Sequence, residues 1–96
     1  MSIEYVVRQK RNEILRIAER HGAYNVRVFG SVARGEAGPH SDVDLLIDAG
    51  EKVTPWFPGG LVYDLEELLG RRVDVVTEKA LRPELRQYVL REAKPL

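Results

Sequence analysis

Three short runs of residues that favour β-strands are spaced along only 96 residues, and helical segments lie between them. Strands are predicted over residues 25–29, 43–48 and 73–76. Helices are predicted over residues 3–21, 32–34, 61–69 and 81–93, and the first three end at Gly22, Gly35 and Gly70. This order predicts an α/β (α+β) fold in which helices cover a small three-stranded sheet. The pattern leaves the strand directions open.

The composition narrows the classes of function. The length predicts a single domain over residues 1–96, and 44% hydrophobic residues argue against disorder. The formal net charge is zero, so direct binding of duplex nucleic acid is not expected. The absence of cysteine excludes disulfides and thiolate zinc sites, and two histidines are too few for a histidine cluster. No membrane-spanning run and no signal-peptide pattern are visible, so a cytoplasmic protein is expected.

Gly30 and Ser31 lie where the first strand meets the short helix. A glycine lets the backbone approach a ligand closely, and the free N–H groups that start a helix favour phosphate. The Ser31 hydroxyl and Arg34, one turn later, could add contacts to an anion. The simpler alternative is a turn in which Ser31 only caps the short helix.

Asp42 and Asp44 enter the second strand with one residue between them. Alternate residues of a strand share a face, so the two carboxylates would stand side by side, roughly 6–7 Å apart at the backbone. Adjacent carboxylates repel unless a cation neutralises them, and oxygen ligands of this kind suit Mg²⁺. A solvated pair at the start of a strand is the alternative.

Asp74 lies between Val73 and Val75 in the third strand, where an aspartate is poorly suited. If this strand lies beside the second, Asp74 can face Asp42 and Asp44. Three carboxylates on one face predict a two-metal site for phosphoryl or nucleotidyl transfer. The structural alternative is a salt bridge between Asp74 and Arg72.

The motifs together resemble a known family. Gly30-Ser31, Ala33-Arg34-Gly35 and the run 41–45 (SDVDL) are similar to the signature of the DNA polymerase β-like nucleotidyltransferase superfamily. The resemblance is strongest to its minimal nucleotidyltransferases, a group often found as MntA-type antitoxins beside HEPN-domain partners. The stretches 69–77 and 81–93 also resemble that group, so the similarity extends over nearly the whole chain.

The resemblance implies a nucleotidyltransferase fold with a mixed sheet and a role for each site residue. Gly30 and Ser31 would hold the nucleoside triphosphate, with Arg34 and Ser41 as supporting phosphate contacts. Asp42, Asp44 and Asp74 would be the catalytic carboxylates and the ligands of two Mg²⁺ ions. The implied reaction transfers AMP from ATP to a tyrosine hydroxyl on a HEPN-domain toxin. The alternatives are a non-catalytic module that neutralises a toxin by binding it, and transfer to a small hydroxylated molecule.

Three further features carry expectations of their own. Trp56 and Phe57, in the loop 49–60, are expected to fold back onto the core, although an exposed pair could stack on a base or anchor a partner. His21 is expected to be a helix-end residue. An uncovered edge of a small sheet would favour self-association or the docking of a partner.

Overall fold

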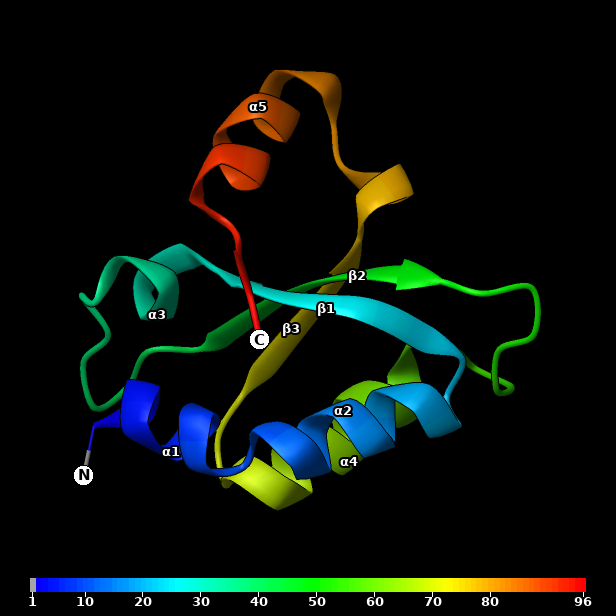
Figure 1. The fold of residues 1–96 in the computed structure, drawn as a ribbon, viewed down its shortest axis with the longest axis horizontal. Coiled ribbons are helices and arrows are strands. Elements are labelled where there is room, and N and C mark those ends of the chain that lie inside the picture. Colours follow the sequence, from blue (N-terminus) through cyan, green and yellow to red (C-terminus); the bar gives the residue numbers. More distant parts are fainter. Residues whose placement is uncertain (1) are drawn as a thin grey trace.

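The fold is taken from a computed structural model, which describes residues 2–96 (Figure 1). Five α-helices and one short 3-10 helix form among these residues: α1 (Ile3–Gln9), α2 (Arg11–Arg20), α3 (Gly30–Arg34), α4 (Gly59–Leu69), η1 (Glu78–Ala80) and α5 (Pro83–Glu92). The strands are β1 (Ala23–Phe29), β2 (Val43–Ala49), β3 (Val73–Thr77) and β4 (Lys94–Pro95). None of these helices is long and apolar enough to cross a lipid bilayer.

The strands form one mixed sheet in the order β3-β2-β1-β4. β2 runs antiparallel to β1 and parallel to β3, and β4 runs antiparallel to β1. The prediction of a mixed sheet is therefore confirmed, but the expected number of three strands is wrong. β4 is only two residues long and contains Pro95, so it has neither the alternation nor the length that marks a strand in a sequence.

Helices α1, α2 and α4 cover one face of the sheet, as Figure 1 shows. On the side of β2 that faces these helices, Val43, Leu45 and Ile47 are almost fully buried. β2 therefore lies at the centre of the core between the sheet and the helices. The core also takes in Ile14 of α2 and Leu61 of α4, which have no exposed surface. The predicted helical layer and the inward face of β2 are thus confirmed.

The opposite face of the sheet lies under η1 and α5. Leu46 of β2 is buried on this side, and η1 contacts β2 there. The side chain of Arg27 donates to Asp48 of β2 over 3.1 Å and to Glu78 of η1 over 3.4 Å. These charge-assisted bonds attach the segment that leads into α5 to the sheet.

Two local predictions differ from the structure. The predicted helix over 3–21 is two helices that meet at Lys10, whose backbone leaves the helical region, and each half buries its own apolar stripe. The alternative in which Ser31 caps the short helix is not found, because α3 begins at Gly30 and no side chain caps it. Ser31 consequently lies inside the first turn of α3.

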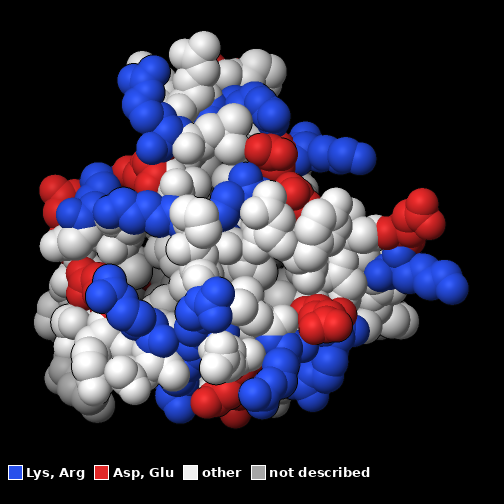
Figure 2. Space-filling view, viewed as in Figure 1, with Lys and Arg blue, Asp and Glu red and all other residues white. Residues whose placement is uncertain are grey.

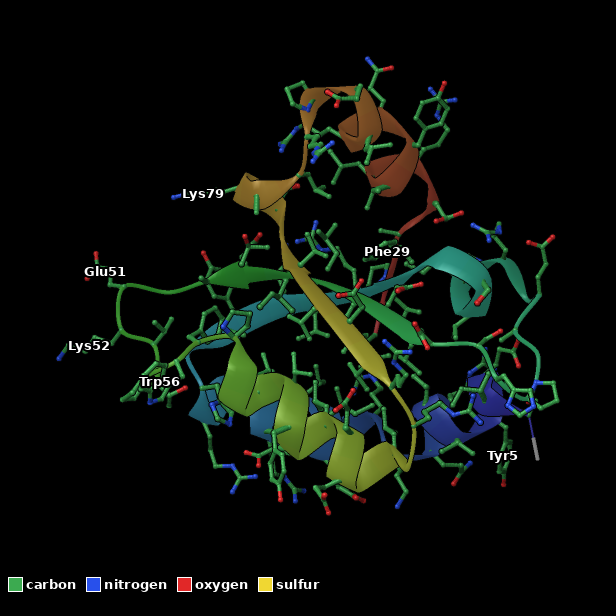
Figure 3. All side chains as sticks on the ribbon, turned by 180° about the vertical axis from the view of Figure 1, so that it is seen from behind. Tyr5, Phe29, Glu51, Lys52, Trp56 and Lys79 are labelled. Atoms are coloured by element: carbon green, nitrogen blue, oxygen red, sulfur yellow. The ribbon has the colours of Figure 1, made fainter. Side chains whose placement is uncertain are left out.

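The loop between β2 and α4 is attached to α2 by His21. One ring nitrogen of His21 hydrogen-bonds Thr54 at 2.6 Å, and the other hydrogen-bonds Asp64 of α4 at 2.7 Å. His21 does follow a helix end, as predicted, but its ring also joins three segments. The aromatic pair was expected to fold back onto the core, and Phe57 does pack against it. For Trp56 the expectation is wrong, because its side chain is 91% exposed. Trp56 projects with Glu51 and Lys52 from one end of the molecule (Figure 3).

Replacement of Gly22 by a residue with a side chain should strongly destabilise the fold. Its φ is +89°, and a Cβ atom would lie 2.1 Å from the carbonyl oxygen of Lys52. We expect Gly22→Ala to lower the free energy of unfolding by about 3 kcal/mol, since backbone strain and overpacking add. The measurement is the midpoint of urea unfolding.

Gly70→Ala is the matched control, because Gly70 also has a positive φ of +67° but no atom within 4 Å of the added carbon. It should cost about 1 kcal/mol, the strain alone. Equal losses for the two variants would contradict the packing argument.

Candidate active site

The three aspartates come from the neighbouring strands β2 and β3. Asp44 is the second residue of β2 and Asp74 is the second residue of β3, and the parallel register pairs them directly. Asp42 lies just before β2, two residues from Asp44. Since Val43 and Val73 are buried in the helix-covered core, Asp44 and Asp74, the next residues along the two strands, face the other side of the sheet. The sequence-based condition that β3 lies beside β2 is therefore confirmed.

Asp44 is the most perturbed of the three carboxylates. Its pKa is raised, first by partial burial and then by the negative charges of Asp74, Asp42 and Glu92, while Arg34 opposes the shift. These contributions place four carboxylates and one guanidinium in the same electrostatic neighbourhood. Concentrated negative charge of this kind disfavours ionisation unless a cation balances it.

The salt bridge considered as an alternative for Asp74 is not formed. Among residues 2–96, no ion pair joins Asp74 to Arg72, and the Asp74 side chain is exposed. The neighbouring Arg71 instead donates to the carbonyl oxygen of Ser41 over 3.0 Å. Arg71 thereby holds the chain immediately before Asp42, and Asp74 stays available on the carboxylate face.

Gly30 is pressed against Asp44 at the end of β1. Its φ is +72°, and a Cβ atom would lie 2.2 Å from Oδ2 of Asp44. The register agrees, because the preceding residue, Phe29, pairs with Asp44 across the sheet. A glycine is required here both for the backbone conformation and for the close approach to the carboxylate. The Gly-Ser turn and the Asp-x-Asp motif are thus in direct contact.

The N–H of Gly30 already has a partner. It donates to Oε2 of Glu92, at the end of α5, over 2.7 Å, and Arg34 donates to Oε1 of the same carboxylate. Arg34 also donates to Glu36. The pKa of Glu92 is lowered, first by the hydrogen bond from Arg34 and also by that from Gly30, although burial opposes this. Glu92 is therefore ionised at neutral pH.

Glu92 is the residue that the sequence did not indicate. It lies 62 positions from Gly30 along the chain, on a helix in which no site residue was predicted. No local signal could have found it, because only the return of the chain over the sheet brings it to the turn.

The two serines differ in their surroundings. Ser31 is partly buried in the first turn of α3, directly after the glycine that contacts Asp44. The hydroxyl oxygen of Ser41 accepts a hydrogen bond from the N–H of Gly38 over 2.8 Å, so Ser41 shapes the loop before Asp42. Its predicted contact with phosphate remains a prediction, as does that of Ser31.

The carboxylates fit a divalent cation without forming a closed cage. Within residues 2–96, no group of three or more acidic, histidine or cysteine side chains is arranged to hold a metal ion by itself. Mg²⁺ commonly takes one or two carboxylates and completes its shell with waters and substrate phosphates. The repulsion at Asp44 and the open carboxylate face suit a cation that binds together with a phosphate-bearing ligand.

Two cavities flank the carboxylates. One of about 370 Å³ lies beside Asp42, between the loop before β2 and the turn before β3, and is lined by Arg71 and Arg72 among others. The other, of about 440 Å³, lies between α3 and α5 and is lined by Ala33, Arg34, Tyr88, Arg91, Glu92 and Lys94. The basic side chains on the face in Figure 2 are broken up by acidic and uncharged ones, so the positive charge there is local.

Comparisons with known proteins identify the family. The sequence profile of the nucleotidyltransferase domain family matches residues 10–96. The chain is similar to protein adenylyltransferase MntA of Thermococcus cleftensis, with 43% identity over 76 residues that cover 79% of this chain and 77% of the relative. It is also similar to MJ0435 of Methanocaldococcus jannaschii, a candidate protein adenylyltransferase, with 37% identity over 87 residues that cover 91% of this chain and 94% of the relative.

Solved structures share the fold. One described as a candidate minimal nucleotidyltransferase has a TM-score of 0.86 and 52% identity, and the match covers 100% of this chain and 97% of the other. A variant of the toxin–antitoxin MntA–HpeT has a TM-score of 0.73 and 25% identity, and the match covers 90% of this chain and 70% of the other. The family indicated by the Gly-Ser and Asp-x-Asp motifs is confirmed: the chain belongs to the nucleotidyltransferase domain family, and within it to the minimal nucleotidyltransferases.

Proposed function

We propose that this nucleotidyltransferase is a Mg²⁺-dependent protein adenylyltransferase that acts as the antitoxin of a HEPN-domain toxin. The observation that carries the proposal is the direct pairing of Asp44 with Asp74 on one sheet face, with Asp42 beside them and the Gly30 turn in contact. Support for AMP transfer to a protein comes from the names of the relatives, and support for a toxin partner comes from the MntA–HpeT structure.

In this proposal each group has a defined part. Gly30 and Ser31 hold the triphosphate, with Arg34 and Ser41 as outer contacts. Asp42, Asp44 and Asp74 would hold two Mg²⁺ ions, which would supply positive charge that neutralises the phosphates. Asp74, the most exposed of the paired aspartates, accepts the proton of the acceptor hydroxyl. The hydroxyl oxygen forms a bond to the α-phosphorus of ATP, and the bond to the departing pyrophosphate breaks.

The open carboxylate face favours a macromolecular acceptor. Asp74 and Asp42 are exposed, so a side chain from another protein can reach them without entering an enclosed pocket. A tyrosine hydroxyl on the toxin has the reach and the chemistry for this attack. A small hydroxylated acceptor would need a pocket that excludes water, which favours the protein acceptor over the small molecule.

The first test is transfer itself. The protein, purified together with the product of its neighbouring gene, should add one adenylyl group to that partner in the presence of ATP and Mg²⁺, detected by mass spectrometry. Changing Asp42→Asn and Asp44→Asn together should lower the rate at least about 100-fold, because the cation sites and their charge stabilisation are lost.

Glu51→Gln is the control, since Glu51 is an exposed carboxylate at the end of the molecule that also carries Trp56 (Figure 3). It should transfer AMP at the normal rate. Undiminished neutralisation of the toxin by the double variant would mean that binding, and not catalysis, is the mechanism.

The second test uses stability. Because the pKa of Asp44 is raised in the folded protein, its ionised carboxylate destabilises the fold at neutral pH. The contribution of Asp44 to stability is therefore complete below its ordinary pKa of 3.8 and is lost as the pH rises through the raised value. Without metal at pH 7, Asp44→Asn should raise the free energy of unfolding by up to about 1 kcal/mol, the range of cross-strand charge pairs.

Asp48→Asn is the matched control on the same strand, because Asp48 accepts hydrogen bonds from Arg27 and Asn25. Asp48→Asn should therefore destabilise the protein.

Thermal unfolding should also show that Mg²⁺ raises the melting temperature of the unchanged protein and leaves that of Asp44→Asn nearly constant. A destabilised Asp44→Asn would contradict the assignment of Asp44 to a cation site.

A further inference from the structure

The carboxylate of Glu92 accepts hydrogen bonds from two donors that a bound phosphate would also need. Its Oε2 accepts from the N–H of Gly30 over 2.7 Å, and its Oε1 accepts from the guanidinium of Arg34. The Glu92 side chain is 24% exposed and that of Arg34 is 50% exposed, so this contact borders on solvent at the rim of the site.

A carboxylate and a phosphate bind to the same kinds of hydrogen-bond donor. Both offer two anionic oxygens to a backbone N–H and to the fork of an arginine. One N–H cannot donate to both in good geometry. An anion that reaches Gly30 must therefore replace Glu92 or bind elsewhere.

Glu92 also adds to the negative charge around Asp44. Glu92 contributes to the repulsion that raises the pKa of Asp44, so it adds a fourth negative charge to a carboxylate face. Incoming phosphates would add more negative charge to the same neighbourhood. Moving Glu92 toward solvent relieves this repulsion at the moment when phosphates enter.

We infer that Glu92 is an internal competitor of the substrate, whose carboxylate takes the place of a phosphate on Gly30 and Arg34 and leaves when a nucleoside triphosphate binds. This inference rests on the proposed function, since it takes the Gly30 turn as the triphosphate site. It assigns to α5 a regulatory role: the affinity for nucleotide is set by how firmly the end of this helix holds the turn.

The attachment of α5 is compatible with release. None of its residues is fully buried, and Leu85 and Tyr88 are 51% and 70% exposed. In its first half Arg86 donates to the carbonyl oxygen of Glu78, and one residue after its end the chain pairs with β1 as β4. The contact of Glu92 with Gly30 and Arg34 is thus one of few polar attachments of the helix among the described residues.

The test measures binding of inorganic tripolyphosphate with equimolar Mg²⁺ by calorimetry, which reads the phosphate chain without base or transfer. Glu92→Gln should bind about fivefold to tenfold more tightly than the unchanged protein, because a neutral amide competes less well than a carboxylate. The same variant should be less stable in the absence of ligand. A purely structural Glu92 would lower stability and affinity together, and unchanged or weaker binding would overturn the inference.

Two control variants separate the effect from net charge. Glu36→Gln removes a carboxylate from Arg34 but leaves Gly30 bound to Glu92, so its affinity should rise by no more than about twofold. Glu84→Gln removes an exposed charge from the first turn of α5 and should not change the affinity. Tightening of equal size in all three variants would reduce the effect to charge and overturn the inference.

A measurement on the unchanged protein covers the case in which Glu92→Gln does not fold. In NMR titrations, the amide resonance of Gly30 and the side-chain carboxyl resonance of Glu92 should shift with the same half-saturation. A shift of Gly30 alone would overturn the inference. Competition by Glu92 without any AMP transfer would refute the proposed function only, whereas AMP transfer without competition would refute this inference only.

Discussion

The parallel pairing of β2 with β3 is the constraint on which the rest of the structure depends. One face of β2 is taken up by Val43, Leu45 and Ile47, which are buried beneath α1, α2 and α4. Because side chains alternate along a strand, burial of this face directs Asp44 to the other side, and the register then places it beside Asp74. A slip of one residue would put an aspartate into the core and a valine into the site, so the hydrophobic core and the carboxylate site hold the same register.

The arrangement of carboxylates around Asp44 is unfavourable for the stability of the fold. Partial burial and three neighbouring carboxylates act against the ionisation of Asp44, and Gly30 closes on it so tightly that no side chain could be accommodated. Other parts of the molecule offset this unfavourable free energy. Among the described residues the core contains no buried polar side chain, and charge-assisted bonds from Arg27 attach η1 to β2. Sites that bind cations with phosphates commonly carry unbalanced charge of this kind until the ligand arrives.

The segment after β3 gives the site its limits. The chain crosses the open face of the sheet as η1 and α5, and it returns to the edge of β1 as β4. This route brings Glu92 to Gly30 and Arg34, and it leaves Asp42 and Asp74 exposed. One part of the carboxylate face is thus covered by the protein itself, while the part that an acceptor would approach stays open.

The sequence by itself determined what depends on neighbouring residues. The periodicity of apolar residues and the glycines placed three strands and the later helices within a few residues, although the first predicted helix is two. The spacing of Asp42 and Asp44 predicted that both carboxylates share one face. The tertiary structure alone decided what depends on distant residues: the pairing of Asp44 with Asp74, the contact of Gly30 with Asp44, the two-residue strand β4, and the bond from Gly30 to Glu92. Local patterns report how a segment buries its own surface, whereas strand register and long-range contacts arise from packing between segments, which no local pattern encodes.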